Sequence, residues 1–449
     1  MNKKKVTIIG AGLVGSLLGI FLARRGYRVS IFERRPDMRN LKISAGRSIN
    51  LALSDRGIRA LEEVGIMDSI REITIPMHGR NIHNADGSSA FQPYGKKGQF
   101  INSVSRGELN ARLMNLAEEL GIDIFFNQRC THINWQKNLI HFSSENSSSE
   151  NEVYADLIFG ADGAYSAARL THQLQHDRFQ YQQYYIDYGY KELAILPGKD
   201  SSFLLEKNAL HIWPRGKYML IALPNIDGSF TCTLFFPFEG NPSFETLNNP
   251  VAVRKFFEEH FTDAAALMPN LEEQFFNNPT SSLVTVKCYP WIRGDRFTLI
   301  GDAAHAIVPF FGQGMNCGFE DCAVLDKLMS THNDDWHSIL TTFQELRKPD
   351  ADAIADLALT NFIEMRDKVA DPAFLLQKKI EAGFSKKHPD KWIPAYSLVT
   401  FSPQIRYSEA LQRGNNQEAI MKKIMQLPNI ENSWDSPEVE ESILQLLNA

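Results

Sequence analysis

A glycine-rich turn between two short apolar segments constrains the fold of this chain more than any other feature. Residues 6–10 (VTIIG) have the composition of a buried strand and run into GAGLVG, after which the pattern predicts an apolar helix and a second strand ending at Glu33. Gly10 allows the tight turn, Gly12 lets backbone amides approach a pyrophosphate, and Gly15 lets helix and strand pack closely. Glu33 follows Gly15 by 18 residues, where a carboxylate can bind both hydroxyls of an adenosine ribose. The pattern predicts a dinucleotide-binding βαβ unit.

The same N-terminus allows a second interpretation. Three lysines at positions 3–5 precede 18 mostly apolar residues, a pattern that is also typical of a signal peptide or a short membrane anchor. Glycines at positions 10, 12, 15 and 19 weaken a membrane helix, and no small-residue cleavage site follows. The second strand also comes at the distance that a βαβ unit needs. We therefore favour the dinucleotide-binding unit.

Length, charge and cysteine usage narrow the class of protein. A chain of 449 residues exceeds what one core usually supports, so two or three lobes are expected. The net charge of −6 argues against a nucleic-acid partner. The five cysteines show no metal-ligand spacing, which predicts reduced thiols and no metal site. No other apolar run has membrane-spanning length, so we expect a soluble, cytoplasmic protein without an obligate protein partner.

A second motif predicts which dinucleotide is bound. The strand-like segment 296–300 runs into Gly301-Asp302, and Pro309 and the run GQGMN from Gly312 to Asn316 follow. In the flavoprotein arrangement that this pattern resembles, Asp302 would bond the ribityl chain, which nicotinamide nucleotides lack. A helix beginning near Gly314 would direct its positive end to the flavin pyrimidine edge, where negative charge gathers on reduction. The alternative is that Asp302 merely caps a helix.

A third motif lies between these two. Asp162-Gly163 follows a strand-like segment and precedes a helix start at Ser166. Alone, the pair would be an ordinary turn. As the third motif in chain order, it follows the pattern that flavin hydroxylases use near the flavin and the nicotinamide, so Asp162 is predicted to be cofactor-binding.

The order GxGxxG, DG, GD resembles the single-component, FAD-dependent aromatic hydroxylases. Three further segments are similar to the kynurenine 3-monooxygenase family in particular: residues 46–54 (GRSINLALS), 105–110 (SRGELN) and 308–317 (VPFFGQGMNC). The likeness runs from residue 5 to about residue 410. The resemblance implies a resident, non-covalent FAD, and the absence of a second GxGxxG implies that NADPH visits only transiently. L-kynurenine and O2 are the implied co-substrates.

Site residues follow from the resemblance position by position. The implied FAD contacts are Gly10, Gly12, Leu13, Gly15, Glu33, Ala52, Arg106, Asp162, Asp302, Gly314, Met315 and Asn316. The amino-acid end of the substrate is expected against Arg80, Tyr94, Asn361 and Tyr396, with Glu364, one helical turn from Asn361, near the ammonium. An α-carboxylate is well bound by a bidentate guanidinium and hydroxyl donors. Without the family, Arg80 and Glu364 would be surface charges, and the two tyrosines would be core edges.

The implied reaction is hydroxylation of L-kynurenine to 3-hydroxykynurenine through a hydroperoxyflavin, in tryptophan degradation. The aniline nitrogen already enriches the ortho carbon in electrons, so no catalytic acid or base is nominated among the side chains. Pro309, Phe310 and Gln313 are expected to position the reactants, with Phe310 touching the substrate, and water must be excluded. Two alternatives remain open: a flavin hydroxylase of another arylamine or phenol, and a non-enzymatic flavin-binding redox sensor.

The strand and helix patterns predict an α/β fold, α+β overall. Residues 1–75, 100–180 and 285–330 should form a discontinuous Rossmann-like FAD-binding domain. Residues 76–99 and 181–284 should form an antiparallel-sheet substrate lobe, and residues 331–449 a helical region broken at Pro394 and Pro403. The polar run 143–152 is expected to be the mobile tip of a hairpin. Animal members of the family carry a C-terminal membrane anchor, whereas this chain ends in the polar ESILQLLNA, as expected for the soluble microbial type.

Overall fold

A six-stranded sheet forms the centre of one half of the molecule, and its strands come from both ends of the residue range 5–299. The computed structural model describes residues 4–40, 50–96, 98–144, 147–364 and 371–448. The sheet has the order β18-β19-β12-β1-β2-β8, and the neighbours from β19 to β8 run parallel. Its strands are β1 (Lys5–Ile9), β2 (Arg28–Phe32), β8 (Asp123–Phe125), β12 (Leu157–Gly160), β18 (Ile292–Arg293) and β19 (Phe297–Leu299). Val6, Ile8 and Ile9 are buried, which is typical of a parallel strand covered on both faces.

The glycine-rich turn connects β1 to helix α1 (Leu13–Arg24) as predicted. Gly10 has φ +105°, a conformation that L side chains rarely adopt. A Cβ on Gly15 would lie 2.0 Å from the Gly10 carbonyl oxygen, so only glycine permits this approach of helix and strand. The helix ends at Arg25, and Gly26 follows with φ +77°. The βαβ interpretation of the N-terminus is confirmed.

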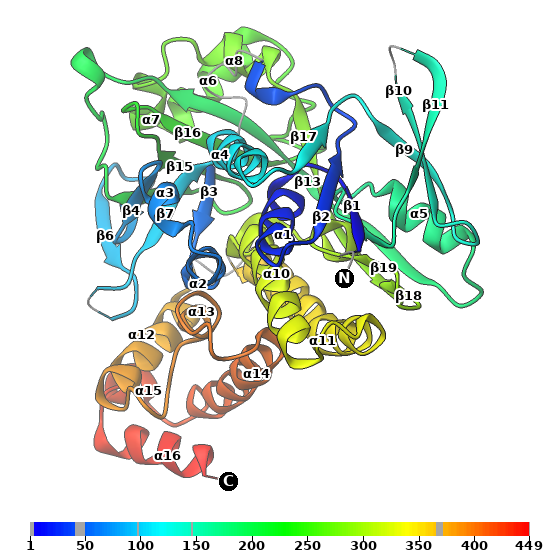
Figure 1. Cartoon of the computed structure of the whole chain (residues 1–449). Coiled ribbons are helices and arrows are strands. Elements are labelled where there is room, and N and C mark those ends of the chain that lie inside the picture. The colour runs from blue at the N-terminus through cyan, green and yellow to red at the C-terminus, as the bar shows by residue number, and fades with distance from the viewer. Residues whose placement is uncertain (1–3, 41–49, 97, 145–146, 365–370, 449) are drawn as a thin grey trace.

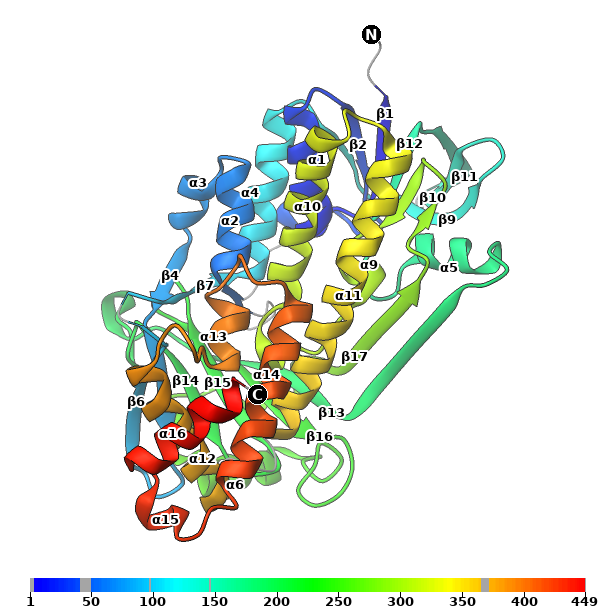
Figure 2. The ribbon, with the colours of Figure 1, turned by 90° about the horizontal axis from the view of Figure 1, so that it is seen from below.

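Helices and a small second sheet cover the two faces of the central sheet (Figures 1 and 2). Helix α1 packs against α4 (Arg106–Glu119) and α10 (Gly314–Thr331). On the other face, Phe142 stacks on Phe32 with 4.2 Å between ring centroids. Phe142 belongs to an antiparallel sheet of β9 (Arg129–Asn134), β10 (Leu139–Ser144) and β11 (Ser147–Tyr154). The core of this half therefore lies between three layers.

The predicted hairpin around the serine-rich run is confirmed, but the prediction of a loop from 143 to 152 is wrong. Strand β11 begins at Ser147, and Ser144 pairs with it across the hairpin. Main-chain hydrogen bonds between strands do not require apolar side chains, so a polar run can extend a ladder that neighbouring apolar residues hold in register. Residues 145–146 at the tip, like residues 46–49 of the GRSINLALS segment, lie outside the described residues.

A seven-stranded sheet forms the second lobe, in the order β17-β13-β16-β15-β14-β5-β6. Its strands are β5 (Gly79–His83), β6 (Ser89–Pro93), β13 (Gln180–Ile195), β14 (Ala209–Pro214), β15 (Met219–Pro224), β16 (Phe230–Pro237) and β17 (Thr280–Tyr289). Five of its neighbour pairs are antiparallel, but β14 and β5 run parallel, so the sheet is mixed rather than purely antiparallel. Turn signals specify antiparallel neighbours only, which is why this pair was not predicted.

Shorter elements connect and cover the two large sheets. Strands β3 (Asn50–Leu53), β7 (Ile101–Ser105) and β4 (Thr74–Met77) form an antiparallel sheet that was not predicted. The other short elements before residue 202 are α2 (Asp55–Glu63), α3 (Met67–Arg71), α5 (Ala167–Leu174), and the 3-10 turns η1 (Met38–Asn40) and η2 (Lys199–Ser201). A phenylalanine-rich core lies between the seven-stranded sheet and α6 (Pro250–His260), α7 (Thr262–Ala266) and α8 (Leu271–Asn277).

After β19 the chain is helical, as predicted. The elements are α9 (Asp302–His305), η3 (Pro309–Phe311), α10, α11 (Trp336–Ile363), α12 (Pro372–Lys387), α13 (Ala395–Thr400), α14 (Tyr407–Ile424), α15 (Ile430–Ser433) and α16 (Pro437–Leu447). Pro394 is the N-cap residue of α13 and Pro403 lies just before α14, so both predicted breaks are confirmed. Among the described helices, none combines the length and the apolar sequence that crossing a membrane requires.

Candidate functional site

Three motifs that are far apart in the sequence meet at the carboxyl ends of β1, β12 and β19. A Cβ on Gly10 would lie 2.6 Å from the carbonyl oxygen of Ala161, and one on Gly301 would lie 3.0 Å from Val14. The glycine turn, the Asp162 loop and the Gly301 turn are therefore in contact. In open parallel sheets, ligands bind in the crevice at this end of the strands.

The start of helix α1 is open. Gly12 is its N-cap residue, no side chain caps it, and a Cβ on Gly12 would meet nothing within 4 Å. Leu13, the first helical residue, is half-buried beside it. Uncapped amides at the positive end of a helix, with free space beside them, suit an anionic phosphate.

Glu33 is held at the end of β2 with its carboxylate toward the glycine turn. Its Oε2 accepts a hydrogen bond from the Ala11 amide at 3.0 Å, and its Oε1 accepts from Arg35 Nε at 2.8 Å. Burial alone would raise the pKa of this carboxyl, but the hydrogen bonds and charge of Arg35 leave the pKa lowered. The Arg35 side chain is 61% exposed, so it can move away when another donor competes for the carboxylate.

Asp302 does not cap a helix. The N-cap residue of α9 is Gly301, with φ +59°, and no side chain makes a capping hydrogen bond there. Asp302 is exposed, and within the described part of the chain no hydrogen bond or ion pair to its carboxylate is found. An unpartnered carboxylate at the carboxyl end of β19 is available to a hydroxyl-bearing ligand.

The carboxylate of Asp162, by contrast, serves its own helix. It accepts hydrogen bonds from the Ser166 hydroxyl and from the amides of Ala167 at 2.7 Å and Ala168 at 3.2 Å. Burial keeps its pKa raised in spite of these donors. The side chain therefore acts as a helix cap, and a cofactor contact at this position would fall to the backbone.

The residues expected at the flavin edge form a rigid turn. Asn316 is fully buried, its Nδ2 donates to the carbonyls of Ala52 and Gly312, and its Oδ1 accepts from the Ser54 amide. These contacts tie β3 to the start of α10. Gly314 and Met315 are the first two residues of that helix, and Met315 is half-buried. A contact from Asn316 to a cofactor would again use the backbone.

Gln313 is likewise engaged with the protein. Its Nε2 donates to the Ser54 hydroxyl at 3.3 Å, and its Oε1 accepts from the Tyr407 hydroxyl at 2.8 Å. Pro309 begins η3 directly before this turn. Arg106 is exposed at the first position of α4. Its charge partly offsets the burial that raises the pKa of Glu192 to about 7, so Arg106 lies near the seven-stranded sheet.

Arg80 is brought together with both predicted tyrosines. Its guanidinium lies 4.4 Å from the ring centroid of Tyr396 and 5.4 Å from that of Tyr94. The two rings are near-parallel, with centroids 5.9 Å apart. Arg80 is half-buried, but its Nε and the Tyr94 hydroxyl are buried atoms that have no hydrogen-bond partner in the described part of the chain. Among the described residues no carboxylate forms an ion pair with Arg80, so this cluster is a positive site that lacks an anion.

An aromatic array extends from this cluster toward the flavin turn. Tyr396 stacks on Phe311, with ring centroids 5.5 Å apart, and Phe310 packs on Phe235 at 5.0 Å and Phe362 at 4.4 Å. Asn361 Nδ2 donates to the Phe310 carbonyl at 2.6 Å, so this side chain holds the turn. Glu364 is the C-cap residue of α11, three residues beyond Asn361. The predicted substrate residues thus come from β5, the segment after β6, α11 and α13.

Comparison with known proteins shows the family to which the chain belongs. The family described as FAD binding domain matches residues 3–358. Kynurenine 3-monooxygenase of Flavobacterium johnsoniae is 52% identical over 444 residues, which cover 99% of this chain and 98% of that protein. The enzyme of the same name from Dictyostelium discoideum is 45% identical over 437 residues, covering 94% and 93%. The chain belongs to the kynurenine 3-monooxygenase family.

Solved structures with a similar fold are more distant in sequence than these kynurenine 3-monooxygenases. The tetrameric form of 2-methyl-3-hydroxypyridine-5-carboxylic acid oxygenase superimposes with a TM-score of 0.68 at 20% identity, covering 84% of this chain and 96% of that one. PqsL of Pseudomonas aeruginosa, described as a probable FAD-dependent monooxygenase, gives 0.65 at 17% identity, covering 82% and 97%. At this level of identity the likeness concerns the fold alone.

The residues present suit the FAD of a kynurenine 3-monooxygenase. Gly12 leaves free space beside the uncapped start of α1, the Glu33 carboxylate lies at the glycine turn, and the Asp302 carboxylate has no partner among the described residues. The sequence-based prediction did not include Arg169. This buried side chain donates to the carbonyls of Ala303 at 2.7 Å and Ala164 at 2.6 Å, and so joins two of the three motifs. In the sequence, only the position of Arg169 shortly after Asp162-Gly163 and Ser166 could have indicated this role.

Proposed function

We propose that this chain is a flavin-dependent monooxygenase that hydroxylates L-kynurenine to 3-hydroxykynurenine, with NADPH and O2 as co-substrates. The observation that carries the substrate assignment is the half-buried guanidinium of Arg80, because its buried Nε and the neighbouring Tyr94 hydroxyl have no hydrogen-bond partner among the described residues. Unsatisfied buried donors are costly unless a ligand completes them. The α-carboxylate of an amino acid is such a ligand. The relatives are named kynurenine 3-monooxygenase, which supports an aromatic amino acid, L-kynurenine, as the molecule that carries this carboxylate.

FAD, when bound, would accept a hydride from NADPH and activate O2. The side chains of this chain would place and shield the reactants. Arg80 and Tyr94 would bind the carboxylate, and the ring of Tyr396 would pack against both of these side chains. Asn361 would hold the Phe310 carbonyl. Phe310 and Phe311 would exclude water from the ring that they face. An aniline ring is already activated at its ortho carbon, so no general base is assigned.

We infer the same division of tasks that the sequence predicts. Residues 1–75, 100–180 and 285–330 would hold FAD, with Glu33 binding the ribose and Asp302 the ribityl chain. Residues 76–99 and 181–284 would supply the sheet behind the substrate, and the region from 331 onward would close the site. Five buried, unpaired thiols support a reducing, cytoplasmic setting.

The test is the conversion itself. Purified, FAD-loaded protein should oxidise NADPH faster when L-kynurenine is added, and mass analysis should find a product heavier by one oxygen atom. Oxidation of NADPH that is stimulated by another arylamine or phenol but not by L-kynurenine would move the assignment to that substrate. Tight FAD with no stimulation by any aromatic amino acid would favour a flavin-binding redox sensor and would refute the proposal.

A further inference from the structure

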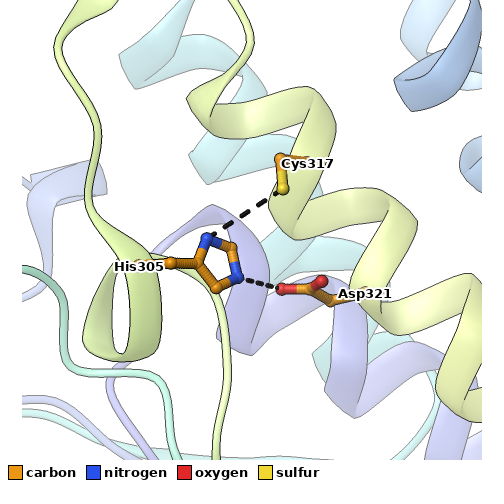
Figure 3. A group of neighbouring side chains, drawn as sticks. All are labelled: His305, Cys317 and Asp321. Carbon is orange, nitrogen blue, oxygen red and sulfur yellow. Dashed lines mark hydrogen bonds and ion pairs between the residues drawn. The ribbon is translucent and has the colours of Figure 1, made fainter. Parts of the chain in front are cut away.

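The carboxylate of Asp321, on helix α10, is fully buried behind the Gly301 turn and receives three donors, of which His305 is drawn in Figure 3. Its Oδ2 accepts from the Gly301 amide at 3.2 Å and pairs with His305 Nε2 at 2.7 Å. Its Oδ1 accepts from Arg347 Nε of α11 at 2.6 Å. One side chain therefore joins the Gly301 turn, α9 and α11.

This cluster is not built for a metal ion, although His305, Cys317 and Asp321 have ligand atoms within 4.8 Å of one another. His305 faces Asp321 with Nε2 and Cys317 with Nδ1, so the imidazole ring stands between the two other groups (Figure 3). One ion binds only one of these nitrogens. Arg347 also lies within 3.4 Å of Cys317 Sγ, and its charge would repel a cation. The cluster is a closed hydrogen-bond network.

The bond to Gly301 determines where the following residue points. Gly301 has φ +59° and ψ −144°, a backbone conformation that needs glycine and a fixed amide direction. Its amide donates to Asp321, and the side chain of the next residue, Asp302, is exposed and has no partner in the part of the chain that the structure describes. A rotation of the Gly301 peptide would move the Asp302 carboxylate away from the crevice.

The same network reaches the turn at the predicted flavin edge. Arg347 Nη1 donates to Glu320 at 2.7 Å, and Arg56 Nη1 donates to the other oxygen of Glu320 at 2.7 Å. The Arg56 guanidinium lies 3.9 Å from the ring centroid of Tyr407, whose hydroxyl holds Gln313. Buried charges and hydrogen bonds thus connect the Gly301 turn to the Gln313 turn without a gap in the chain of contacts.

We propose that Asp321 is a positioning residue for the flavin: with Arg347 and His305 it holds the Gly301 turn so that Asp302 stands ready for the ribityl chain before FAD binds. This inference rests on the proposed FAD contact of Asp302. Asp321 itself would not touch the cofactor and would act only by holding the Gly301 turn. Preorganised donors and acceptors bind a ligand more tightly because less ordering is lost on binding.

The test is FAD affinity of Asp321→Asn, with Asp326→Asn as the matched control. Asp326 lies on the same helix and pairs with Arg25 at 2.5 Å, but it does not touch the Gly301 turn. Titration of apoprotein with FAD, followed by flavin fluorescence, should show a dissociation constant about tenfold or more higher for Asp321→Asn, and for Asp326→Asn a change well below twofold. The absorption spectrum of the remaining bound flavin should shift only in Asp321→Asn, and the apparent KM for L-kynurenine should stay unchanged.

Asp321→Asn leaves two buried cations short of a partner and can fail to fold. His305→Gln then provides the test, because glutamine keeps a donor near Asp321 while the Arg347 contact remains; its FAD dissociation constant should rise about threefold. An unchanged dissociation constant in either folded variant would overturn the positioning role. The FAD titration and the absorption spectrum need no turnover, so these two readouts remain valid if L-kynurenine proves not to be the substrate.

Discussion

Replacing Arg80 by methionine should weaken substrate binding strongly and change the stability of the substrate-free protein little. Truncating one partner of a buried, hydrogen-bonded charge pair costs about 2–5 kcal/mol of binding free energy. Since 1.4 kcal/mol corresponds to a factor of ten, the dissociation constant for L-kynurenine should rise about thirtyfold or more. FAD content should not change, because Arg80 lies on β5 in the seven-stranded sheet, away from the three glycine motifs.

The expected small effect on stability follows from the same geometry. Without substrate, Arg80 Nε is buried without a partner, which costs about 1–3 kcal/mol, and methionine removes that cost. Methionine also loses the contacts of the guanidinium with the rings of Tyr94 and Tyr396, each worth about 0.5–2 kcal/mol. The two terms nearly offset each other, so the free energy of unfolding should stay within about 1 kcal/mol of wild type.

Arg347→Met is the informative comparison. Arg347 is fully buried, whereas Arg80 is half-buried, and Arg347 pairs with Asp321 and Glu320, so its removal leaves the buried Asp321 carboxylate without this cation. That should cost about 3–5 kcal/mol of stability. Urea unfolding of FAD-loaded protein gives the stabilities, and flavin fluorescence titration with L-kynurenine gives the affinities. An Arg80→Met protein that binds L-kynurenine normally, or that loses as much stability as Arg347→Met, would refute the view that Arg80 awaits an anion from the substrate.

Three further predictions concern the cofactor site and pH. Glu33→Ala and Asp302→Ala should each weaken FAD retention by about 1.5–3 kcal/mol, since each removes a charge-assisted hydrogen bond to a sugar hydroxyl; full FAD occupancy after extensive dialysis would contradict both roles. Gly15→Ala should prevent folding of the turn, because its Cβ would lie 2.0 Å from the Gly10 oxygen. The Cβ of Gly12→Ala would meet nothing within 4 Å, so this variant should fold but bind FAD poorly. Thermal unfolding and FAD titration of the two variants separate these effects. Burial lowers the pKa of His211 from 6.5 to about 4, so the unfolded chain binds a proton at this histidine more readily than the folded protein does. The stability that neutral His211 contributes is therefore present above about pH 6.5 and is lost as the pH falls toward 4. Urea unfolding at several pH values should show His211→Gln losing less stability than wild type over that interval, and equal slopes would exclude this histidine.

The parts of the fold that were predicted correctly depend on local chemistry. Gly10 and Gly15 are required by a positive φ and a close backbone approach. Pro394 is the N-cap residue of α13, where proline removes no hydrogen bond of the helix. The parallel pairing of β5 with β14 joins segments about 130 residues apart, and no turn signal within either segment specifies it. Register between such distant strands is determined by the packing of the whole lobe, which a single sequence does not display.

The candidate site shows the same division between local and distant information. A motif identifies a position but not which of its atoms are free. Asp162 and Asn316 were expected to contact the cofactor, and in the structure the Asp162 carboxylate caps α5 and the Asn316 amide ties β3 to α10. Arg169 and Asp321 show the converse, because each is a single charged residue in a helix until the fold places it beside a second motif. A buried charge is tolerated only with partners, and those partners come from other elements. Residues that orient a site are therefore recognised in the structure by the hydrogen bonds that they make to other elements. Residues that bind a ligand, such as Arg80, are recognised by buried polar atoms that have no partner among the described residues.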